Sequence, residues 1–425
     1  MAGRERLLII GLDGAPYSLI RDLAERGIMP NMAGLIEEGV LTKMAPTIPD
    51  VSAVSWSTII TGVNPGEHGV YGFTNLLEGT YILTFHDFTK LKAPTFWQMD
   101  RSKRYVVINV PSTYPASEIN GFIVTGFVSP DLKKAVYPPG YLSLLQEIGY
   151  RVDIDVARCR QSPMLLFSEL SETLDTRLKL CLRLWSELDW DVTMFVITGT
   201  DRVGHFQWKA YLDEDDKWHE AFLEFFSHVD RVIGELVSRL GRNDGLIMLS
   251  DHGMELLEVE VNLNAYLVSE GYLRLHEGRR GYNAIAEGTL AFALEPSRIY
   301  LNREGKYPRG CVKRGEEEEL LEELTNLFSK LEFEGRKVVK KVYRRDEIYH
   351  GQHLEDAPDL VLVPERGFSF TTRISKTEVF GRSDLTGKHN DEAFLYVRGE
   401  EAQEVVPENP SVEDVLRIMR TLQHH

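Results

Sequence analysis

Cysteine is scarce in this chain. The 425 residues contain only Cys159, Cys181 and Cys311, and long stretches of sequence separate them. An odd number of widely spaced cysteines gives neither a disulfide framework nor a Cys-x-x-Cys metal motif. We therefore expect each thiol to be a buried structural residue.

Long hydrophobic runs are also missing. A helix that spans a bilayer needs about 20 consecutive apolar residues, and no run in the sequence approaches that length. The N-terminal stretch MAGRERLLIIGLDG has two arginines before an apolar segment, but the segment is too short for a signal peptide and breaks at Asp13. This stretch predicts a buried strand, and we expect a soluble, cytoplasmic protein with no membrane partner.

Positive charge is in short supply. Lysine and arginine number 48 against 65 aspartates and glutamates, which gives a formal net charge of -17 at pH 7. Nucleic acids and anionic membranes would repel such a chain at long range, so we exclude both as partners. Two uses of the acidic excess stay open, namely ordinary solubility charge and local binding of metal ions.

Short, continuous apolar runs alternate with amphipathic helical segments through most of the chain. Hydrophobic residues make up 43% of the sequence, which is enough for a full core. The runs are LLIIGL (7–12), YVVINV (105–110), FIVTGF (122–127), VTMFVIT (192–198) and GLIMLS (245–250), and the longest helical segments are 163–188 and 214–240. Continuous rather than alternating runs suit strands covered by helices on both faces. The pattern predicts an α/β fold with a doubly wound, mostly parallel central sheet.

The alternation of apolar runs and helical segments changes after Asp251. Residues 263–350 contain one strand-like piece, LAFALEPSRIYLN, and an acidic helix, RGEEEELLEELTNLFSKL, before strand character returns at PDLVLVP (358–364). We expect 1–262 and 351–425 to form the catalytic domain, with 263–350 as a small inserted subdomain near the active site. The sequence shows no internal repeat and no clear second domain.

Three of the buried runs are followed by an aspartate. The runs lead to Asp13, Asp201 and Asp251. An aspartate just past a parallel strand lies at the carboxyl edge of the sheet, where open α/β folds bind ligands. A single such aspartate often caps the next helix. Three of them at one edge would repel one another unless a cation neutralised them, so together they predict a metal site.

Three histidines add nitrogen ligands to this prediction. His205 follows Asp201 by four residues, His252 follows Asp251 directly, and His389 lies far downstream in TGKHND. Carboxylate oxygen with imidazole nitrogen is a ligand mixture typical of zinc and also accepted by manganese, whereas magnesium and calcium prefer oxygen alone. Three aspartates and three histidines suffice for two divalent ions with three protein ligands each. We expect zinc, with manganese as the alternative.

The stretch SAVSWSTIITG (52–62) carries five hydroxyl side chains in an apolar run. Its flanking signals, Pro49 and Asp50 before and Gly62 after, predict a helix that begins at Ser52. The exposed N–H groups and positive dipole at that end would bind a phosphate and favour an alkoxide, so Ser52 is the candidate nucleophile. Ser55 lies one turn further on roughly the same face. We expect the deeper hydroxyls, Ser57, Thr58 and Thr61, to bond to preceding carbonyls or to pack.

Together these motifs resemble the alkaline phosphatase superfamily, and in particular its type I phosphodiesterase/nucleotide pyrophosphatase branch, over nearly the whole chain. The pieces that carry the resemblance are GLDG (11–14), PTIPDVSAVSWSTIITGVNPGEHGVYGF (46–73), TDRVGH (200–205), SDHGM (250–254) and GKHN (387–390). Each is weak alone, but their order and spacing are specific.

The resemblance implies a division of the ligands between two metals. Asp13, Asp251 and His252 would hold one ion, and Asp201, His205 and His389 the other. The family nucleophile lies ten residues before the glycine that ends its helix, and counting back from Gly62 gives Ser52. The resemblance also implies a covalent phospho-enzyme intermediate that water hydrolyses.

One position departs from the family pattern. Nucleotide pyrophosphatases have an asparagine three residues after the nucleophile that donates to a phosphate oxygen, and this chain has Ser55 there. Ser55 is therefore a candidate substrate-binding residue, and the departure weakens the case for a nucleotide substrate. No counterpart of the alkaline phosphatase arginine clamp is identifiable, which favours diesters over monoesters. We expect His350 and His353 on the surface or at a pocket rim.

The leading hypothesis is a metal-dependent phosphodiesterase that acts on a small-molecule phosphoester. A phosphomonoesterase or phosphomutase using the same site is the alternative within the enzymes. A non-catalytic protein that binds metal or phosphate is the alternative of another class. The sequence leaves open whether the chain forms a homo-oligomer.

Overall fold

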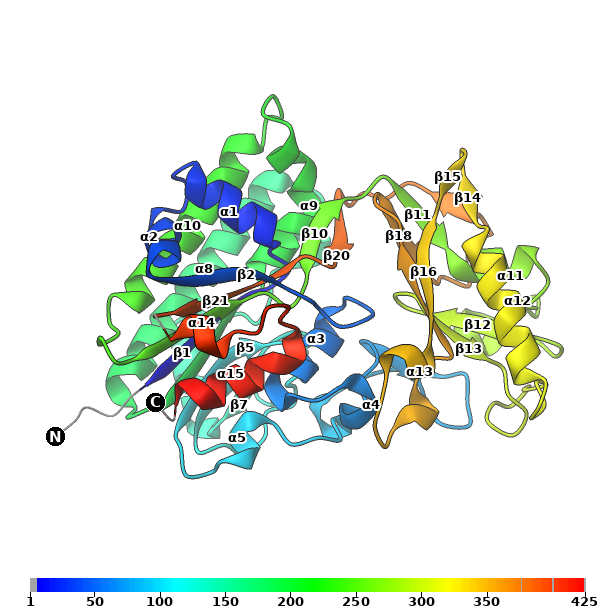
Figure 1. Cartoon of the computed structure of the whole chain (residues 1–425), viewed down its shortest axis with the longest axis horizontal. Coiled ribbons are helices and arrows are strands. Elements are labelled where there is room, and N and C mark those ends of the chain that lie inside the picture. The colour runs from blue at the N-terminus through cyan, green and yellow to red at the C-terminus, as the bar shows by residue number, and fades with distance from the viewer. Residues whose placement is uncertain (1–5, 376, 400, 424–425) are drawn as a thin grey trace. The chain divides into compact units, whose positions relative to one another are not determined.

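A computed structural model describes residues 6–375, 377–399 and 401–423, and Figure 1 shows its course. The chain divides into two compact units. Unit 1 comprises residues 1–63, 87–255 and 385–425, and unit 2 comprises 64–86 and 256–384. The segment 263–350 lies inside unit 2, which also takes in 64–86 and 351–384. Its status as a separate inserted subdomain stays a prediction.

Unit 1 is built on an eight-stranded sheet among the described residues. In spatial order its strands are β2 (Gly39–Met44), β21 (Ala393–Arg398), β9 (Gly245–Leu249), β1 (Leu7–Leu12), β8 (Val192–Ile197), β5 (Tyr105–Val110), β6 (Gly121–Thr125) and β7 (Val136–Tyr137). The five strands from β9 to β6 are parallel, and β2, β21 and β7 are antiparallel to their neighbours. The predicted doubly wound, mostly parallel sheet is confirmed.

Helices cover both faces of this sheet (Figure 1). One face carries α1 (Tyr17–Glu25), α2 (Pro30–Glu38), α8 (Pro163–Glu187), α9 (Gly199–Leu212) and α10 (His219–Val237); the other carries α3 (Ser52–Thr61), α5 (Phe96–Met99), α14 (Ala402–Val405) and α15 (Val415–Leu422). On the second face Trp56, Ile59 and Ile60 of α3 pack into a core formed by the strand side chains. A short ribbon of β10 (Gly253–Leu256) and β20 (Gly387–Asn390) also belongs largely to this unit.

Unit 2 has smaller sheets and its own hydrophobic core. Four strands run in the order β12 (Ala291–Leu294), β13 (Arg298–Leu301), β17 (Leu360–Pro364) and β16 (Val339–Arg344), and three run in the order β18 (Phe368–Thr371), β11 (Val259–Asn262) and β19 (Phe380–Gly381). The hairpins β3–β4 (Thr74–Leu76, Leu83–Phe85) and β14–β15 (Glu332–Phe333, Arg336–Lys337) and the helices α4 (Pro65–His68), α11 (Leu263–Ser269), α12 (Glu317–Ser329) and α13 (Arg345–Ile348) complete it. The piece LAFALEPSRIYLN, predicted as one strand, is two antiparallel strands, because the chain reverses at Glu295 and Pro296.

Strand order brings the predicted aspartates together. β1 lies between β8 and β9, with Leu12 beside Ile197 and Gly11 beside Leu249. The three strands therefore end at the same level, and the residues that follow them meet at one edge of the sheet.

Helix α3 begins at Ser52 and ends at Thr61, as the flanking residues predicted. All ten residues are buried, and the hydroxyls of Ser57 and Thr61 bond back to the carbonyls of Ala53 and Ser57 at 2.6 Å. The packing role expected for these two side chains is confirmed. All three thiols are unpaired, with Cys159 and Cys181 buried and Cys311 half-buried. Within the described residues, no helix has the length and apolar character to cross a bilayer.

Gly62 ends α3 in the left-handed conformation, with φ 68°, and a Cβ at this position would lie 2.7 Å from the Leu416 side chain. We expect Gly62→Ala to lower the free energy of unfolding by about 1–3 kcal/mol, because an L-residue is strained there and Leu416 must move. Urea unfolding followed by circular dichroism measures the change. Gly34→Ala is the matched control. Gly34 is an exposed residue of α2, and a Cβ there has open space, so this variant should not destabilise the protein. Equal stability of Gly62→Ala and the natural protein would contradict this account of the helix end.

Candidate active site

Three buried carboxylates form the centre of the site in unit 1. Asp13 follows β1, Asp251 follows β9, and Asp201 lies in the first turn of α9 after β8. Asp13 and Asp251 are 0% exposed and Asp201 is 3% exposed. Isolated charges at such depth are unfavourable, so the site needs compensating groups.

Asp13 and Asp251 each have one oxygen fixed by a neighbouring donor. The indole Nε1–H of Trp56 donates to Asp13 Oδ2 at 3.2 Å, and the backbone N–H of Gly14 donates to Asp251 Oδ1 at 3.1 Å. Gly14 has φ 67°, and a Cβ there would lie 3.0 Å from Asp201 Oδ1, so the tight turn after Asp13 favours glycine. These bonds leave Asp13 Oδ1 and Asp251 Oδ2 for another partner.

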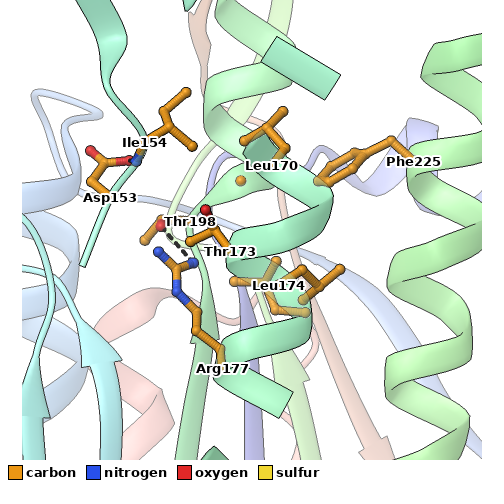
Figure 2. A pocket seen from close by; sticks show the side chains of 10 residues that line it. Asp153, Ile154, Leu170, Thr173, Leu174, Arg177, Thr198 and Phe225 are labelled. Carbon is orange, nitrogen blue, oxygen red and sulfur yellow. Dashed lines mark hydrogen bonds between the residues drawn. The ribbon is translucent and has the colours of Figure 1, made fainter. Parts of the chain in front are cut away.

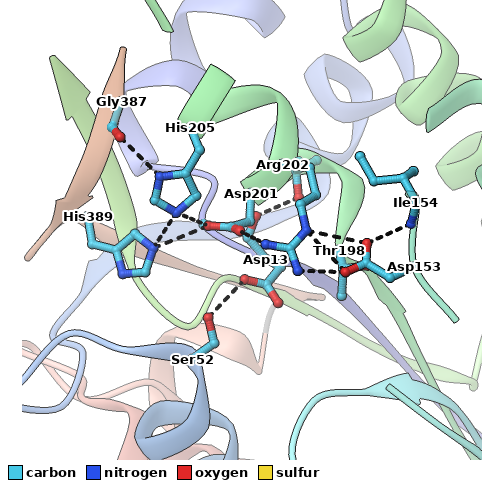
Figure 3. Close-up of polar contacts among 12 residues, drawn as sticks. Asp13, Ser52, Asp153, Ile154, Thr198, Asp201, Arg202, His205, Gly387 and His389 are labelled. Carbon is cyan, nitrogen blue, oxygen red and sulfur yellow. Dashed lines mark hydrogen bonds and ion pairs between the residues drawn. The ribbon is translucent and has the colours of Figure 1, made fainter. Parts of the chain in front are cut away.

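Asp201 likewise has one oxygen beside a protein donor. Its Oδ2 lies 3.4 Å from Nη1 of Arg202, while its Oδ1 faces two histidines (Figure 3). Asp201 Oδ1 and Asp251 Oδ2 are fully buried and accept no hydrogen bond from the part of the chain that the structure describes. Because buried carboxylate oxygens are almost always satisfied, these two atoms are candidate ligands for a cation.

The three histidines all present Nε2 to the carboxylates. Each ring lies with Nδ1 against a backbone carbonyl: His205 against Gly387 at 3.0 Å, His252 against Gly253 at 3.0 Å and His389 against Asp50 at 2.8 Å. A carbonyl only accepts, so Nδ1 of each ring carries the proton, and Nε2 of a neutral ring has a lone pair. Orientation of this kind is typical of histidines that bind metals.

Asp201, His205 and His389 form one compact group (Figure 3). Asp201 Oδ1 lies 3.3 Å from Nε2 of each histidine, and the two Nε2 atoms are 2.9 Å apart. Two lone pairs at that distance repel unless a proton or a metal ion lies between them. Ligand atoms about 2.0–2.1 Å from a tetrahedral zinc ion are about 3.3 Å apart, so the group has the dimensions of a zinc site.

Asp13, Asp251 and His252 form the second group. His252 Nε2 is 3.3 Å from Asp251 Oδ2 and 3.8 Å from Asp13 Oδ1. One ligand atom from each of the three lies within 4.8 Å of the others, and the same holds for Asp201, His252 and His389. The rings of His252 and His389 stack with their centroids 3.6 Å apart, so the two groups adjoin each other.

Ser52 lies against the second group. Its hydroxyl is 3.0 Å from His252 Nε2 and 3.4 Å from Asp13 Oδ1, and the residue is 2% exposed. The serine is the first residue of α3, where unpaired N–H groups and the helix dipole favour negative charge. The structure therefore places this hydroxyl beside the atoms predicted to bind a metal.

The carboxylates perturb one another strongly. Burial, together with the charges of Asp251 and Asp201, raises the pKa of Asp13 well above its usual value, and burial raises the pKa of Asp251 to about 7. Burial would also raise the pKa of Asp201, but His205 and His389 hold it well below its usual range. Burial lowers the pKa of His252, which keeps that ring neutral and ready to bind a cation.

The remaining predicted residues have other contacts. Ser55 is 0% exposed, and its hydroxyl is 2.8 Å from that of Thr47; its substrate-binding role stays a prediction. His350 is exposed and His353 is half-buried in unit 2, and their backbone N–H groups donate to Asn64 Oδ1 and to the Gly66 carbonyl.

Sequence reasoning missed the donors that hold the carboxylates, namely Trp56, Gly14 and Arg202. Each had a signal nearby. Trp56 follows Ser52 by one helical turn, and Gly14 and Arg202 each follow a predicted ligand directly.

Comparison with protein families matches residues 7–391 to the family described as Type I phosphodiesterase / nucleotide pyrophosphatase. The match covers most of the chain and agrees with the motif order. Fold and match together define a phosphoester hydrolase of the alkaline phosphatase superfamily. The chain belongs to the type I phosphodiesterase/nucleotide pyrophosphatase family, which confirms the resemblance and the prediction of an enzyme.

Solved structures share the fold at low identity. Phosphonoacetate hydrolase from Sinorhizobium meliloti 1021, solved with phosphonoformate and with phosphonoacetate, matches with a TM-score of 0.67 and 18% identity over 99% of this chain and 96% of its own. Murine ectonucleotide pyrophosphatase/phosphodiesterase 5 matches with a TM-score of 0.56 and 15% identity over 99% and 95% of the two chains. No curated protein sequence matches significantly.

Metal affinity should depend on pH through Asp251. In the metal-free protein its pKa is about 7, so below that pH a metal ion must displace a proton to bind. Burial also raises the pKa of Asp13, a proposed ligand in the same group, so Asp13 can contribute a second proton. We expect the apparent affinity to fall by about tenfold per pH unit for each proton displaced as the pH falls below about 7. Competition titrations with a chromogenic chelator, and calorimetry in buffers of different ionisation enthalpy, measure the affinity and the released proton. An affinity independent of pH across this range, with no proton release, would contradict the prediction.

Proposed function

We propose that this protein is a metal-dependent phosphodiesterase of the nucleotide pyrophosphatase type, with Ser52 as the nucleophile. The observation that carries the proposal is the position of the Ser52 hydroxyl, 3.0 Å from His252 Nε2 and 3.4 Å from Asp13 Oδ1 at the start of α3. A serine in that position can attack a phosphorus atom held at the same metal site.

Two divalent ions would be held by the two groups of ligands. Asp13, Asp251 and His252 would bind one ion, and Asp201, His205 and His389 the other, with zinc expected and manganese as the alternative. When bound, the ions would acidify the serine hydroxyl and neutralise the charge that develops on the phosphoryl and leaving oxygens. The orphaned oxygens of Asp201 and Asp251 and the converging Nε2 atoms support this fit.

The chain's own groups supply position and charge for the displacement. Ser52 Oγ forms the new bond to phosphorus while the bond from phosphorus to the leaving alcohol breaks, and the departing oxygen takes up the proton that the serine loses. The product is a phosphodiester of Ser52 that keeps the substrate's other ester group. Water then cleaves the bond between phosphorus and Ser52 Oγ, which restores the serine hydroxyl and releases the phosphate monoester. The positive end of α3 favours both the serine alkoxide and the phosphoryl oxygens. Burial of Ser52 restricts the water that could compete with the first step.

A diester is the favoured substrate. A monoester carries a second negative charge at the phosphoryl group, which an arginine commonly binds. The arginine beside this site, Arg202, instead directs its guanidinium to Asp153 and Asp201. A phosphomonoesterase or phosphomutase remains the alternative, and phosphonates belong in the test because a structural relative was solved with phosphonoacetate. A cytoplasmic location stays a prediction.

We expect Ser52→Ala to lower turnover of bis(p-nitrophenyl) phosphate by about 10³-fold or more, since the variant has no nucleophile. Its metal content should not change, because no ligand is altered. Metal analysis of the purified variant, paired with the assay, measures both quantities.

Ser57→Ala is the matched control. Ser57 lies on the same helix and is equally buried, but its hydroxyl donates to the Ala53 carbonyl, so its variant should retain activity. Full activity of Ser52→Ala would refute the proposed nucleophile. Parallel assays with p-nitrophenyl phosphate, a phosphonate monoester and a sulfate ester decide the substrate class, and preference for the monoester would overturn the diester assignment.

A further inference from the structure

We propose that Asp153 and Arg202 act as a positioning pair that keeps one oxygen of Asp201 directed at its metal ion. The inference rests on the proposed function, because it assumes that Asp201 binds a metal. It assigns a role to two residues that neither touch the reacting atoms nor serve as metal ligands.

Arg202 is held in one orientation. Its Nε lies 3.3 and 3.2 Å from the two oxygens of Asp153, and its Nη2 lies 2.6 Å from Asp153 Oδ2, which is a forked contact (Figure 3). The guanidinium carbon also lies 4.6 Å from the centre of the Phe127 ring. A forked carboxylate on one edge and an aromatic ring against one face leave the group little freedom.

The remaining nitrogen of Arg202 reaches the metal ligand. Nη1 lies 3.4 Å from Asp201 Oδ2, on the opposite side of the carboxylate from the histidines. The other oxygen, Oδ1, is 3.3 Å from Nε2 of both His205 and His389. A fixed cation on Oδ2 therefore resists rotation of the carboxylate and keeps Oδ1 on the metal side.

Asp153 is itself anchored to the strand that leads to Asp201. The buried guanidinium of Arg177, on α8, donates to the Val152 carbonyl at 2.7 Å. It also donates to Thr198 Oγ1 at 3.0 Å, just after β8 (Figure 2). The cavity beside Arg177 has a volume of about 10 Å³, which suits at most one water molecule and no ligand. Arg177 thus links the segment that contains Asp153 to the start of α9.

Simple electrostatics argues against an arginine here. Arg202 is a half-buried cation close to a site for two further cations, and its charge should repel them. Both side chains of the Asp153–Arg202 pair are half-buried, so part of their attraction is offset by desolvation and the net gain in stability is small. A role in orienting Asp201 explains the presence of Arg202, whereas its charge alone does not.

The direction in which the metal affinity changes distinguishes a positioning role of the pair from an effect of the Arg202 charge. The double variant Asp153→Asn/Arg202→Met removes one negative and one positive charge and so keeps the local balance. If the pair positions Asp201, one of the two metal equivalents should bind about 10–100-fold more weakly, as is usual for loss of a ligand's hydrogen-bond partner. Charge alone predicts no change for the double variant and tighter binding for Arg202→Met.

The measurement is a titration of the metal-free, full-length protein with zinc against a chelator, with the cobalt absorption spectrum as a second readout of ligand geometry. Arg202→Lys keeps the charge without the fork, so it should also weaken one equivalent, and it serves if the double variant fails to fold. Arg158→Met, in the same segment but exposed and 3.9 Å from Glu169, is the control and should leave both affinities unchanged.

Unchanged or tighter binding in the double variant and in Arg202→Lys would overturn the inference. An equal loss at both equivalents with a lower unfolding temperature would also overturn it, because that result is expected of a merely structural residue. If the natural protein binds neither zinc nor manganese, the proposed function fails as well, and the two failures are thereby distinguished.

Discussion

Mutual repulsion among three buried carboxylates is the constraint on which the rest of the site depends. Asp13, Asp201 and Asp251 meet because β9, β1 and β8 are neighbours in a parallel sheet and end at the same level. Water cannot screen them at this depth, so each is controlled by a specific contact. One oxygen of each receives a donor from the protein. The other oxygen of Asp13 faces the Ser52 hydroxyl, and those of Asp201 and Asp251 are the candidate ligands for a cation.

Close backbone packing makes this arrangement possible. A Cβ on Gly387 would lie 2.3 Å from the Gly204 carbonyl, so β20 can approach α9 closely enough for His389 to meet His205. The same approach allows the Gly387 carbonyl to accept from His205. Backbone carbonyls orient all three rings, and α3 brings Ser52 to the adjoining group. The proposed metal ligands and the proposed nucleophile thus meet beyond one edge of one sheet.

The sequence identified the parts of this site that follow a strand or start a helix. Asp13, Asp201 and Asp251 follow buried runs, and Gly62 fixes the end of α3, so local patterns reveal them. The Asp153–Arg202 pair was not predicted because its members are 49 positions apart and no local pattern joins them. The antiparallel strands β2 and β21 were also missed. The sequence of β2, GVLTKM, carries a lysine because the strand is half-buried, so it does not form a continuous apolar run. The composition of unit 2 was not predicted, because it combines two stretches, 64–86 and 256–384, that are far apart in the sequence.

The central claim is that two metal ions bind side by side, each held by its own group of aspartate and histidine ligands. Anomalous diffraction at the zinc edge, from crystals of the protein loaded with zinc, tests this directly. The account predicts two peaks about 3.5–4 Å apart. One should lie about 2.0–2.2 Å from ligand atoms of Asp13, Asp251 and His252, and the other equally close to Asp201, His205 and His389. A single peak, or peaks bound by other residues such as His350 and His353, would contradict it.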